Sequence, residues 1–177
     1  MRSATIQEIK QELQDQKAPQ LISLCLRLAR FKKENKELLT YLLFEASDEQ
    51  GYVNGIKQEV TETFTEINLS QLYFAKKTLR RILRMINKYV RYSGQKQTEI
   101  ELRLHYCTEL KNSGIPLRQN PVISNLYDGQ LRKIKVLMSA LHEDLQHDYK
   151  KELEPLLDET GAAAAKSWNP FKRKSKK

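Results

Sequence analysis

The sequence predicts an all-α protein, most simply a compact bundle of about seven helices, with a short HEAT-like α-solenoid as the alternative. Glycine and proline are scarce, at six and five of 177 residues, so long segments run without a turn residue. Apolar residues recur at steps of three and four through most of the chain. The alternation of strands and helices that is typical of nucleotide-binding folds is missing.

The length suits one domain with a core, and we expect a helical domain over residues 1–158 and a disordered basic tail over residues 159–177. The opening stretch has no apolar core of signal-peptide length, and no run approaches the roughly 18 apolar residues of a membrane span. We therefore expect a cytoplasmic protein without a transmembrane segment. Cys25 and Cys107 lie among apolar residues, which predicts buried free thiols, with a single disulfide bridge as the alternative.

The first three helices are predicted from caps and composition. Thr5 and Glu8 form a capping-box pair, which predicts a helix over residues 5–16. Pro19 suits the first turn of a second helix, QLISLCLRLARF, and a third follows in ELLTYLLFEA. Both are apolar on nearly every side, so we expect them to form the centre of the core.

Three more helices are predicted in the middle of the chain. The fourth has one apolar face, formed by Val53, Ile56, Val60, Phe64 and Ile67. A second capping-box pair, Asn68 and Gln71, predicts a helix from about residue 69 to Ser93, where Gly94 can take the left-handed position. The sixth covers about residues 96–113, with a core stripe of Ile100, Leu104, Cys107 and Leu110.

The last helix is predicted to be long. Asn120 precedes Pro121 as N-cap and first-turn residue. A single apolar seam of about five turns follows, formed by Tyr127, Leu131, Ile134, Met138, Leu141 and Leu145. Pro155 and Gly161 are expected to end the ordered part.

The net charge of +9 is distributed unevenly. Residues 67–98 carry eight cations and no acid, and residues 166–177 carry six cations and no acid. The positive charge of these two segments exceeds the net charge of the whole chain, so the other residues together carry a net negative charge. Such an asymmetry indicates a local anionic contact more than a general one.

The basic helix of the first segment has apolar residues on one side and cations on the other. A line of charge about 20 Å long could follow a phosphate backbone, and Tyr92 could stack on a base. The alternatives are a solvated face or neutralisation by acids of neighbouring helices. The candidate anion-binding residues are Lys77, Arg80, Arg81, Arg84, Lys88 and Arg91.

The tail, SWNPFKRKSKK, combines Trp168 and Phe171 with a polybasic run, of which Lys172, Arg173 and Lys174 are candidate anion contacts. Such a segment can bind nucleic acid, enter the interface of an anionic membrane, or dock in the groove of a partner protein. A solvated tail without a ligand is the fourth alternative.

Motifs of catalysis and of cofactor binding are missing, including the P-loop and the dinucleotide-binding glycines. HEDLQHDY places Glu143 and His147 at i and i+4, where they could meet a metal ion, but the matching second unit of a di-metal site is missing. We therefore predict no enzyme activity, no cofactor and no metal.

Two stretches, KENKELLTYLLFEASDEQGY and LHEDLQHDYKKELE, resemble a family of small uncharacterised bacterial all-helical proteins over about residues 5–155. The resemblance implies an all-helical fold and no activity. From the residues we expect a non-enzymatic adaptor that contacts nucleic acid or ribonucleoprotein through the basic helix and tail. The alternative is a protein–protein scaffold whose tail docks on a membrane surface or a partner.

Overall fold

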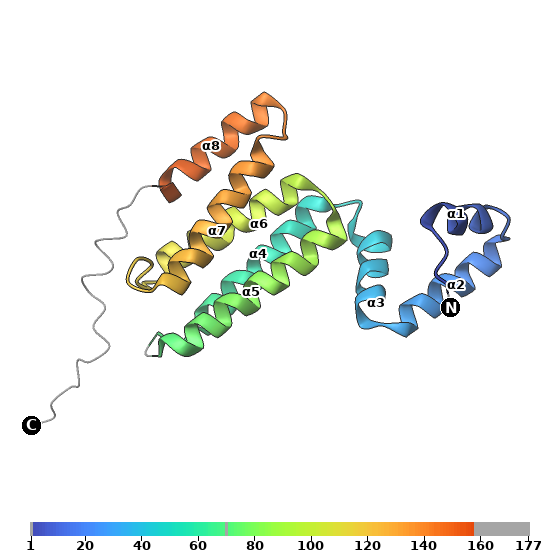
Figure 1. Ribbon diagram of the computed structural model, residues 1–177, viewed down its shortest axis with the longest axis horizontal. Coiled ribbons are helices and arrows are strands. Elements are labelled where there is room, and N and C mark those ends of the chain that lie inside the picture. The colour runs from blue at the N-terminus through green and yellow to red at the C-terminus, as the bar shows by residue number, and fades with distance from the viewer. Residues whose placement is uncertain (1, 70, 158–177) are drawn as a thin grey trace, which may run out of the picture. The chain divides into compact units, whose positions relative to one another are not determined.

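The computed structural model describes residues 2–69 and 71–157, and these residues are all-α (Figure 1). They form eight α-helices and one π-helical segment, with no strand among them. The predicted fold class is therefore confirmed. The chain divides into two compact units, residues 1–47 (the first unit) and residues 48–177 (the second unit). The predicted tail, residues 159–177, lies outside the described residues.

The first unit consists of α1 (Ile6–Gln14), α2 (Ala18–Phe31), α3 (Lys33–Thr40) and the π-helical segment η1 (Tyr41–Glu45). The predicted capping box is present: the Glu8 backbone N–H donates to Thr5 Oγ1, and the Thr5 N–H donates to the Glu8 carboxylate at 2.6 Å. Lys32 adopts an extended backbone between α2 and α3. Asn35 bridges this break by donating to the carbonyl of Leu28 at 2.9 Å.

The prediction that α2 and the segment around η1 form the centre of the core is wrong. In the described part of the first unit, Tyr41 alone among the hydrophobic residues is buried, and eleven large hydrophobic side chains are exposed. A helix that is apolar on every side needs neighbours on every side, and three short helices cannot supply them. Cys25 is exposed here, against the prediction that both thiols are buried.

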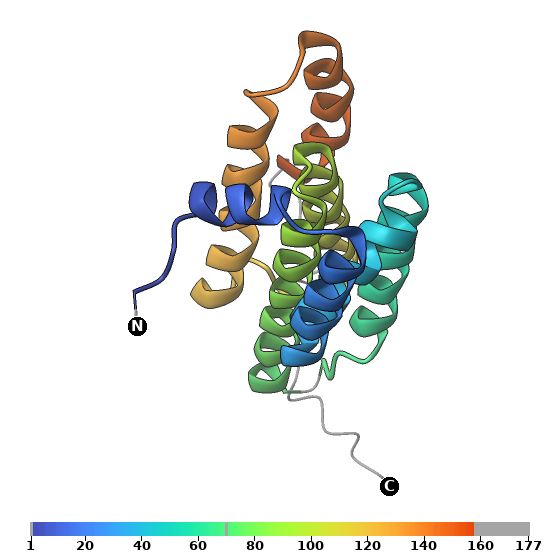
Figure 2. The ribbon, with the colours of Figure 1, turned by 90° about the vertical axis from the view of Figure 1, so that its right-hand side faces the viewer.

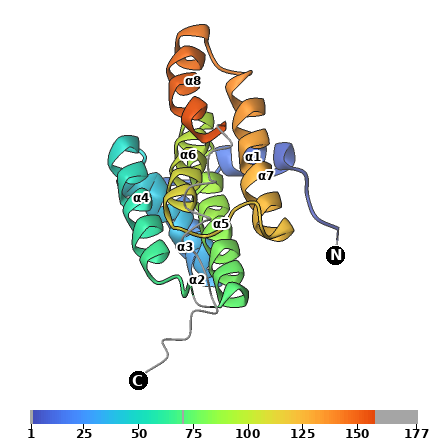
Figure 3. The same cartoon turned by 90° about the vertical axis from the view of Figure 1, so that its left-hand side faces the viewer.

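The second unit is a five-helix bundle of α4 (Glu49–Thr65), α5 (Leu72–Ser93), α6 (Lys96–Asn112), α7 (Pro121–Met138) and α8 (Glu143–Leu157). α6 contacts each of the other four helices, α4 also contacts α5, and α7 also contacts α8. α4 and α7 lie on opposite sides of α6 (Figure 2, Figure 3). The bundle therefore has α6 at its centre.

The burial pattern of the bundle confirms most of the predicted faces. All five apolar residues predicted for α4 are buried, and so are the four of the α6 stripe. α6 also buries Leu102 and Tyr106, which lie outside that stripe. α5 ends as predicted, with Gly94 in the left-handed region at φ 68°. No helix among the described residues is long and apolar enough to cross a membrane.

Two predicted boundaries are wrong. α5 begins at Leu72, three residues after the predicted start, and its N-cap is Gln71 instead of Asn68. The predicted five-turn seam is split, because α7 ends at Met138 and α8 begins after a turn. Pro155 lies inside α8, which ends two residues later at Leu157.

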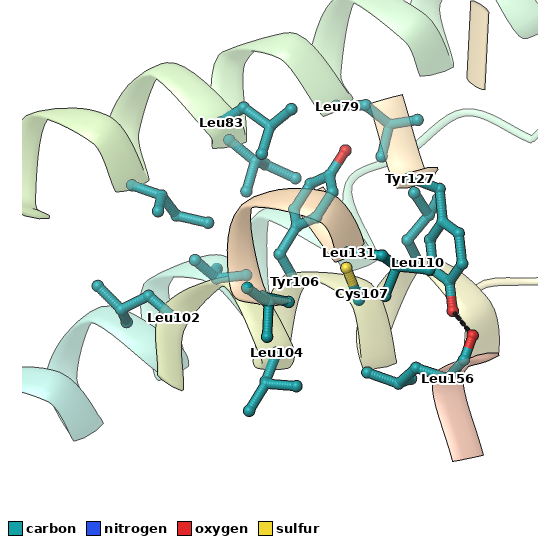
Figure 4. Packing of buried hydrophobic residues seen from close by; sticks show 14 of the residues in the cluster. Leu79, Leu83, Leu102, Leu104, Tyr106, Cys107, Leu110, Tyr127, Leu131 and Leu156 are labelled. Carbon is teal, nitrogen blue, oxygen red and sulfur yellow. Dashed lines mark hydrogen bonds between the residues drawn. The ribbon is translucent and has the colours of Figure 1, made fainter. Parts of the chain in front are cut away.

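Two buried tyrosines of the second unit differ in how their hydroxyl groups are satisfied. Tyr127 donates to the carbonyl of Leu156 at 2.8 Å, which joins α7 to α8 (Figure 4). Tyr106 packs against Phe64 with ring centroids 5.6 Å apart, but its buried hydroxyl has no hydrogen-bond partner among the described residues. Burial accordingly raises the pKa of both phenols above their usual value.

We expect opposite effects from removing these two hydroxyl groups. Tyr106→Phe should raise the free energy of unfolding by about 1 kcal/mol, because it removes a buried polar group that lacks a partner. Tyr127→Phe should lower it by about 1–2 kcal/mol, because the Leu156 carbonyl loses its donor. Chemical denaturation of both variants beside the wild type measures the difference. A loss of stability in Tyr106→Phe equal to that in Tyr127→Phe would contradict this assignment.

Candidate functional site

The cationic side of α5 is the candidate site that the sequence predicted. α5 contains seven cations and no acid over 22 residues. Its opposite side is anchored in the bundle through Ala75, Leu79, Ile82 and Ile86, all buried. This burial fixes the rotation of the helix and turns the cations to the surface. Of the six predicted residues, Lys88 is half-buried. The other five are exposed: Lys77, Arg80, Arg81, Arg84 and Arg91.

The acids of α4 leave most of this charge uncompensated. Glu59 accepts a hydrogen bond from the Tyr89 hydroxyl at 2.9 Å, and Glu49 accepts one from Ser93 Oγ at 2.5 Å. These carboxylates therefore bond hydroxyl groups of α5. Glu66, just after α4, does pair with Arg81 at 2.7 Å, but both side chains are more than half exposed. Exposed ion pairs of this kind contribute little to stability.

The remaining exposed cations of α5 are the candidate contacts for an anion. Lys77, Arg80, Arg84 and Arg91 form no ion pair with any residue in the described ranges. Lys88 lies with its Nζ 4.6 Å from the centre of the Tyr89 ring. Like charges at helical neighbours repel one another by a few tenths of a kcal/mol per pair. An anion bound along this side would relieve that repulsion.

Two aromatic residues beside the cations were missed by the sequence analysis. Tyr73 and Phe74, in the first turn of α5, are 71% and 47% exposed and contact one another edge to face at 5.4 Å. They precede Lys77 by four and three residues, so they flank the N-terminal end of the cationic line. Their position directly before Ala75-Lys76-Lys77 in the sequence could have indicated that they lie beside the cations. The predicted aromatic contact, Tyr92, is instead half-buried, with its ring 6.3 Å from Tyr89.

The predicted contacts of the tail lie outside the described residues. These are Trp168, Phe171, Lys172, Arg173 and Lys174. The candidate site of the structure is therefore the side of α5 formed by Tyr73, Phe74 and the exposed cations, which we call the α5 surface.

A pocket of about 480 Å³ is a separate feature of the second unit, lined by residues of α4, α6 and α8. Lys57 pairs with Glu101 in it at 2.7 Å. His105 lies within hydrogen-bonding distance of Thr61 Oγ1, at 2.9 Å, and of the Lys57 carbonyl, at 3.0 Å. Burial lowers the pKa of His105, although Glu109 at 3.9 Å opposes this effect. These contacts join α4 to α6, and we assign them a structural role.

The sequence cluster around His147 is exposed on α8. Glu143 and His147 both face solvent, and His142 Nδ1 lies 3.3 Å from Asp144. Within residues 2–69 and 71–157, no three His, Cys, Asp or Glu side chains are placed to hold a metal ion. Burial raises the pKa of the Cys107 thiol to about 12, so this sulfur stays protonated at neutral pH.

Comparison of the chain with protein-family models, with curated proteins and with solved structures finds no match.

Proposed function

We propose that the protein is a non-enzymatic adaptor that binds nucleic acid or a ribonucleoprotein through the α5 surface. The observation that carries the proposal is a set of exposed cations on a helix without acids, none of which pairs with an acid of the described residues: Lys77, Arg80, Arg84 and Arg91. Lys77 and Arg91 are 14 residues apart, which corresponds to about 20 Å along the helix axis. Successive phosphates of a nucleic acid can meet such a row of charges.

The aromatic pair favours single-stranded nucleic acid. Bases of a single strand are free to stack on exposed aromatic rings, and each stacked base contributes about 1–3 kcal/mol. Tyr73 and Phe74 offer such rings at one end of the cationic line. Contacts to phosphates and stacking carry little sequence information, so we expect binding with weak sequence preference.

Fluorescence anisotropy with labelled single-stranded RNA, single-stranded DNA and duplex DNA tests the proposal. The logarithm of the affinity should fall linearly with the logarithm of the salt concentration. In Arg80→Gln/Arg84→Gln the slope should become shallower by about 0.7 per lost contact on a single strand, and by about 0.9 on a duplex. Binding should weaken to a similar extent for every sequence tested.

A matched control has the same change in net charge elsewhere on the second unit. Lys150→Gln/Lys151→Gln removes two exposed cations from α8 and should leave the slope unchanged. No binding of any of the three nucleic acids at low salt would refute the proposal, as would equal effects of the two double variants.

Deletion of residues 166–177 separates the α5 surface from the tail. If both contribute, the deletion weakens binding and the effect of Arg80→Gln/Arg84→Gln persists in the shortened chain. Sedimentation with anionic vesicles, done on the full and the shortened chain, tests the alternative that the tail docks on a membrane. Binding to vesicles that depends on the tail, with no binding to nucleic acid, would favour that alternative.

A further inference from the structure

The first unit exposes far more apolar surface than its size requires. Its eleven exposed large hydrophobic side chains outnumber the five of the much longer described part of the second unit. Their exposed fractions add up to more than six whole side chains, which is on the order of 1,000 Å² of apolar surface. A standard interface buries about 800 Å² on each partner, so this surface is comparable in size to one side of such an interface.

Eight of the eleven exposed side chains line two grooves on either side of α2. One groove, of about 780 Å³, lies between α1 and α2 and is lined by Leu24, Leu28 and Phe31. Its rim includes the acids Glu8 and Glu12, with Arg27 as the single cation, and we call it the acidic groove.

The other groove, of about 650 Å³, lies between α2, α3 and η1 and is lined by Leu26, Leu43 and Phe44. We call it the basic groove, because its rim contains no acid and four cations: Arg30, Lys32, Lys33 and Lys36. Lys33 pairs with Glu37 at 3.6 Å, whereas Arg30, Lys32 and Lys36 form no ion pair with a described residue.

The two grooves are complementary to one another in charge and alike in apolar lining. We infer that the first unit is a self-association module, in which the acidic groove of one copy faces the basic groove of a second copy. In a dimer whose two-fold axis runs parallel to α2, the two α2 helices are parallel. The acidic groove of each copy then lies beside the basic groove of the other, so the contact occurs twice. Like charges would meet if α2 packed antiparallel.

This arrangement places Cys25 at the centre of the interface. On the helical wheel of α2, the exposed residues Cys25 and Ile22 lie between the groove-lining residues Leu28 and Leu26. In a parallel two-fold pairing, a residue in this position lies beside its own copy. Cys25 is exposed and Cys107 is buried, so the protein carries one accessible thiol as a reporter.

Analytical ultracentrifugation of the full chain without nucleic acid, over a range of micromolar concentrations, measures the association. We expect a reversible equilibrium between a monomer of 20.8 kDa and a dimer of twice that mass. Ile22→Asp should raise the dissociation constant about 30-fold or more, because it places a charge at the centre of an apolar interface. Ile22 is 61% exposed, so circular dichroism should show unchanged helix content.

An exchange of charges distinguishes the inferred pairing from a general effect on folding. Glu12→Lys and Lys32→Glu should each raise the dissociation constant about threefold to tenfold, because each contact occurs twice. The two variants mixed together, or combined in one chain, should recover most of the lost affinity. A short bis-maleimide should link two wild-type chains through Cys25, and Cys25→Ser should abolish the link.

Three outcomes would overturn the inference. The first is a chain that stays monomeric at high micromolar concentration. The second is a dimer that Ile22→Asp leaves intact, or whose charge variants do not compensate one another. The third is a series of species larger than the dimer, which would indicate head-to-tail association into open filaments instead of a two-fold pair. None of these readouts depends on nucleic acid, so they do not decide the proposed function.

Discussion

Arg103→Ala is expected to lower the free energy of unfolding of the second unit by about 3–5 kcal/mol. Arg103 lies in α6, at the centre of the bundle, and its side chain is only 3% exposed. Its guanidinium donates to Glu99 within α6, to Asn87 of α5 at 2.9 Å and to Gln130 of α7. One side chain therefore connects three helices.

The size of the effect follows from what the substitution leaves behind. Glu99 loses its charged partner, whose Nη2 lies 2.5 Å away, and Gln130, which is buried, loses the donor to its side-chain oxygen. The buried amide of Gln130 keeps its full desolvation penalty without a partner, and the carboxylate of Glu99, which is 23% exposed, keeps part of it. Urea denaturation followed by circular dichroism measures the loss.

Arg84→Ala is the matched control, because it truncates the same residue type at an exposed position of α5. Its effect on stability should stay within about 0.5 kcal/mol. Similar midpoints for the two variants would contradict the assignment of Arg103 as a structural residue. Arg103→Lys should be intermediate, since an ammonium group keeps the charge but cannot bond Glu99, Asn87 and Gln130 in the same geometry.

Leu102→Ala is expected to lower the free energy of unfolding by about 2–5 kcal/mol. The predicted apolar stripe of α6 passes through Ile100 and Leu104 and leaves Leu102 on the far side. A helix with one buried face would expose Leu102, and its truncation would then have little effect. In the bundle Leu102 is fully buried, because α6 has neighbours on both sides.

Val136→Ala provides the comparison for Leu102→Ala, since Val136 on α7 is 70% exposed. We expect a change of about 0.5 kcal/mol or less for this variant. If Leu102→Ala were equally mild, α6 would not be the central helix of the bundle. Equilibrium denaturation of both variants, with the slope of the transition unchanged, decides between the two arrangements.

The candidate site was predictable in its charge and less so in its aromatic residues. The cationic line of α5 follows from helical spacing alone, and the acid-free composition of residues 67–98 marks it. Whether neighbouring acids cover the line depends on where α4 directs its carboxylates. Glu59 and Glu49 reach Tyr89 and Ser93, and no spacing rule in the sequence anticipates those partners.

By itself the sequence determined the helices and their local signals. The Thr5 capping box, the Asn120 N-cap and the left-handed Gly94 depend on contacts within a few residues, so they are readable along the chain. The tertiary structure alone decided which helix is central. α2 is the more apolar helix, yet it is exposed, whereas the more polar α6 is buried and holds Arg103 inside the bundle. The reason is physical: burial depends on how many neighbours surround a helix, and that number is a property of the assembled chain.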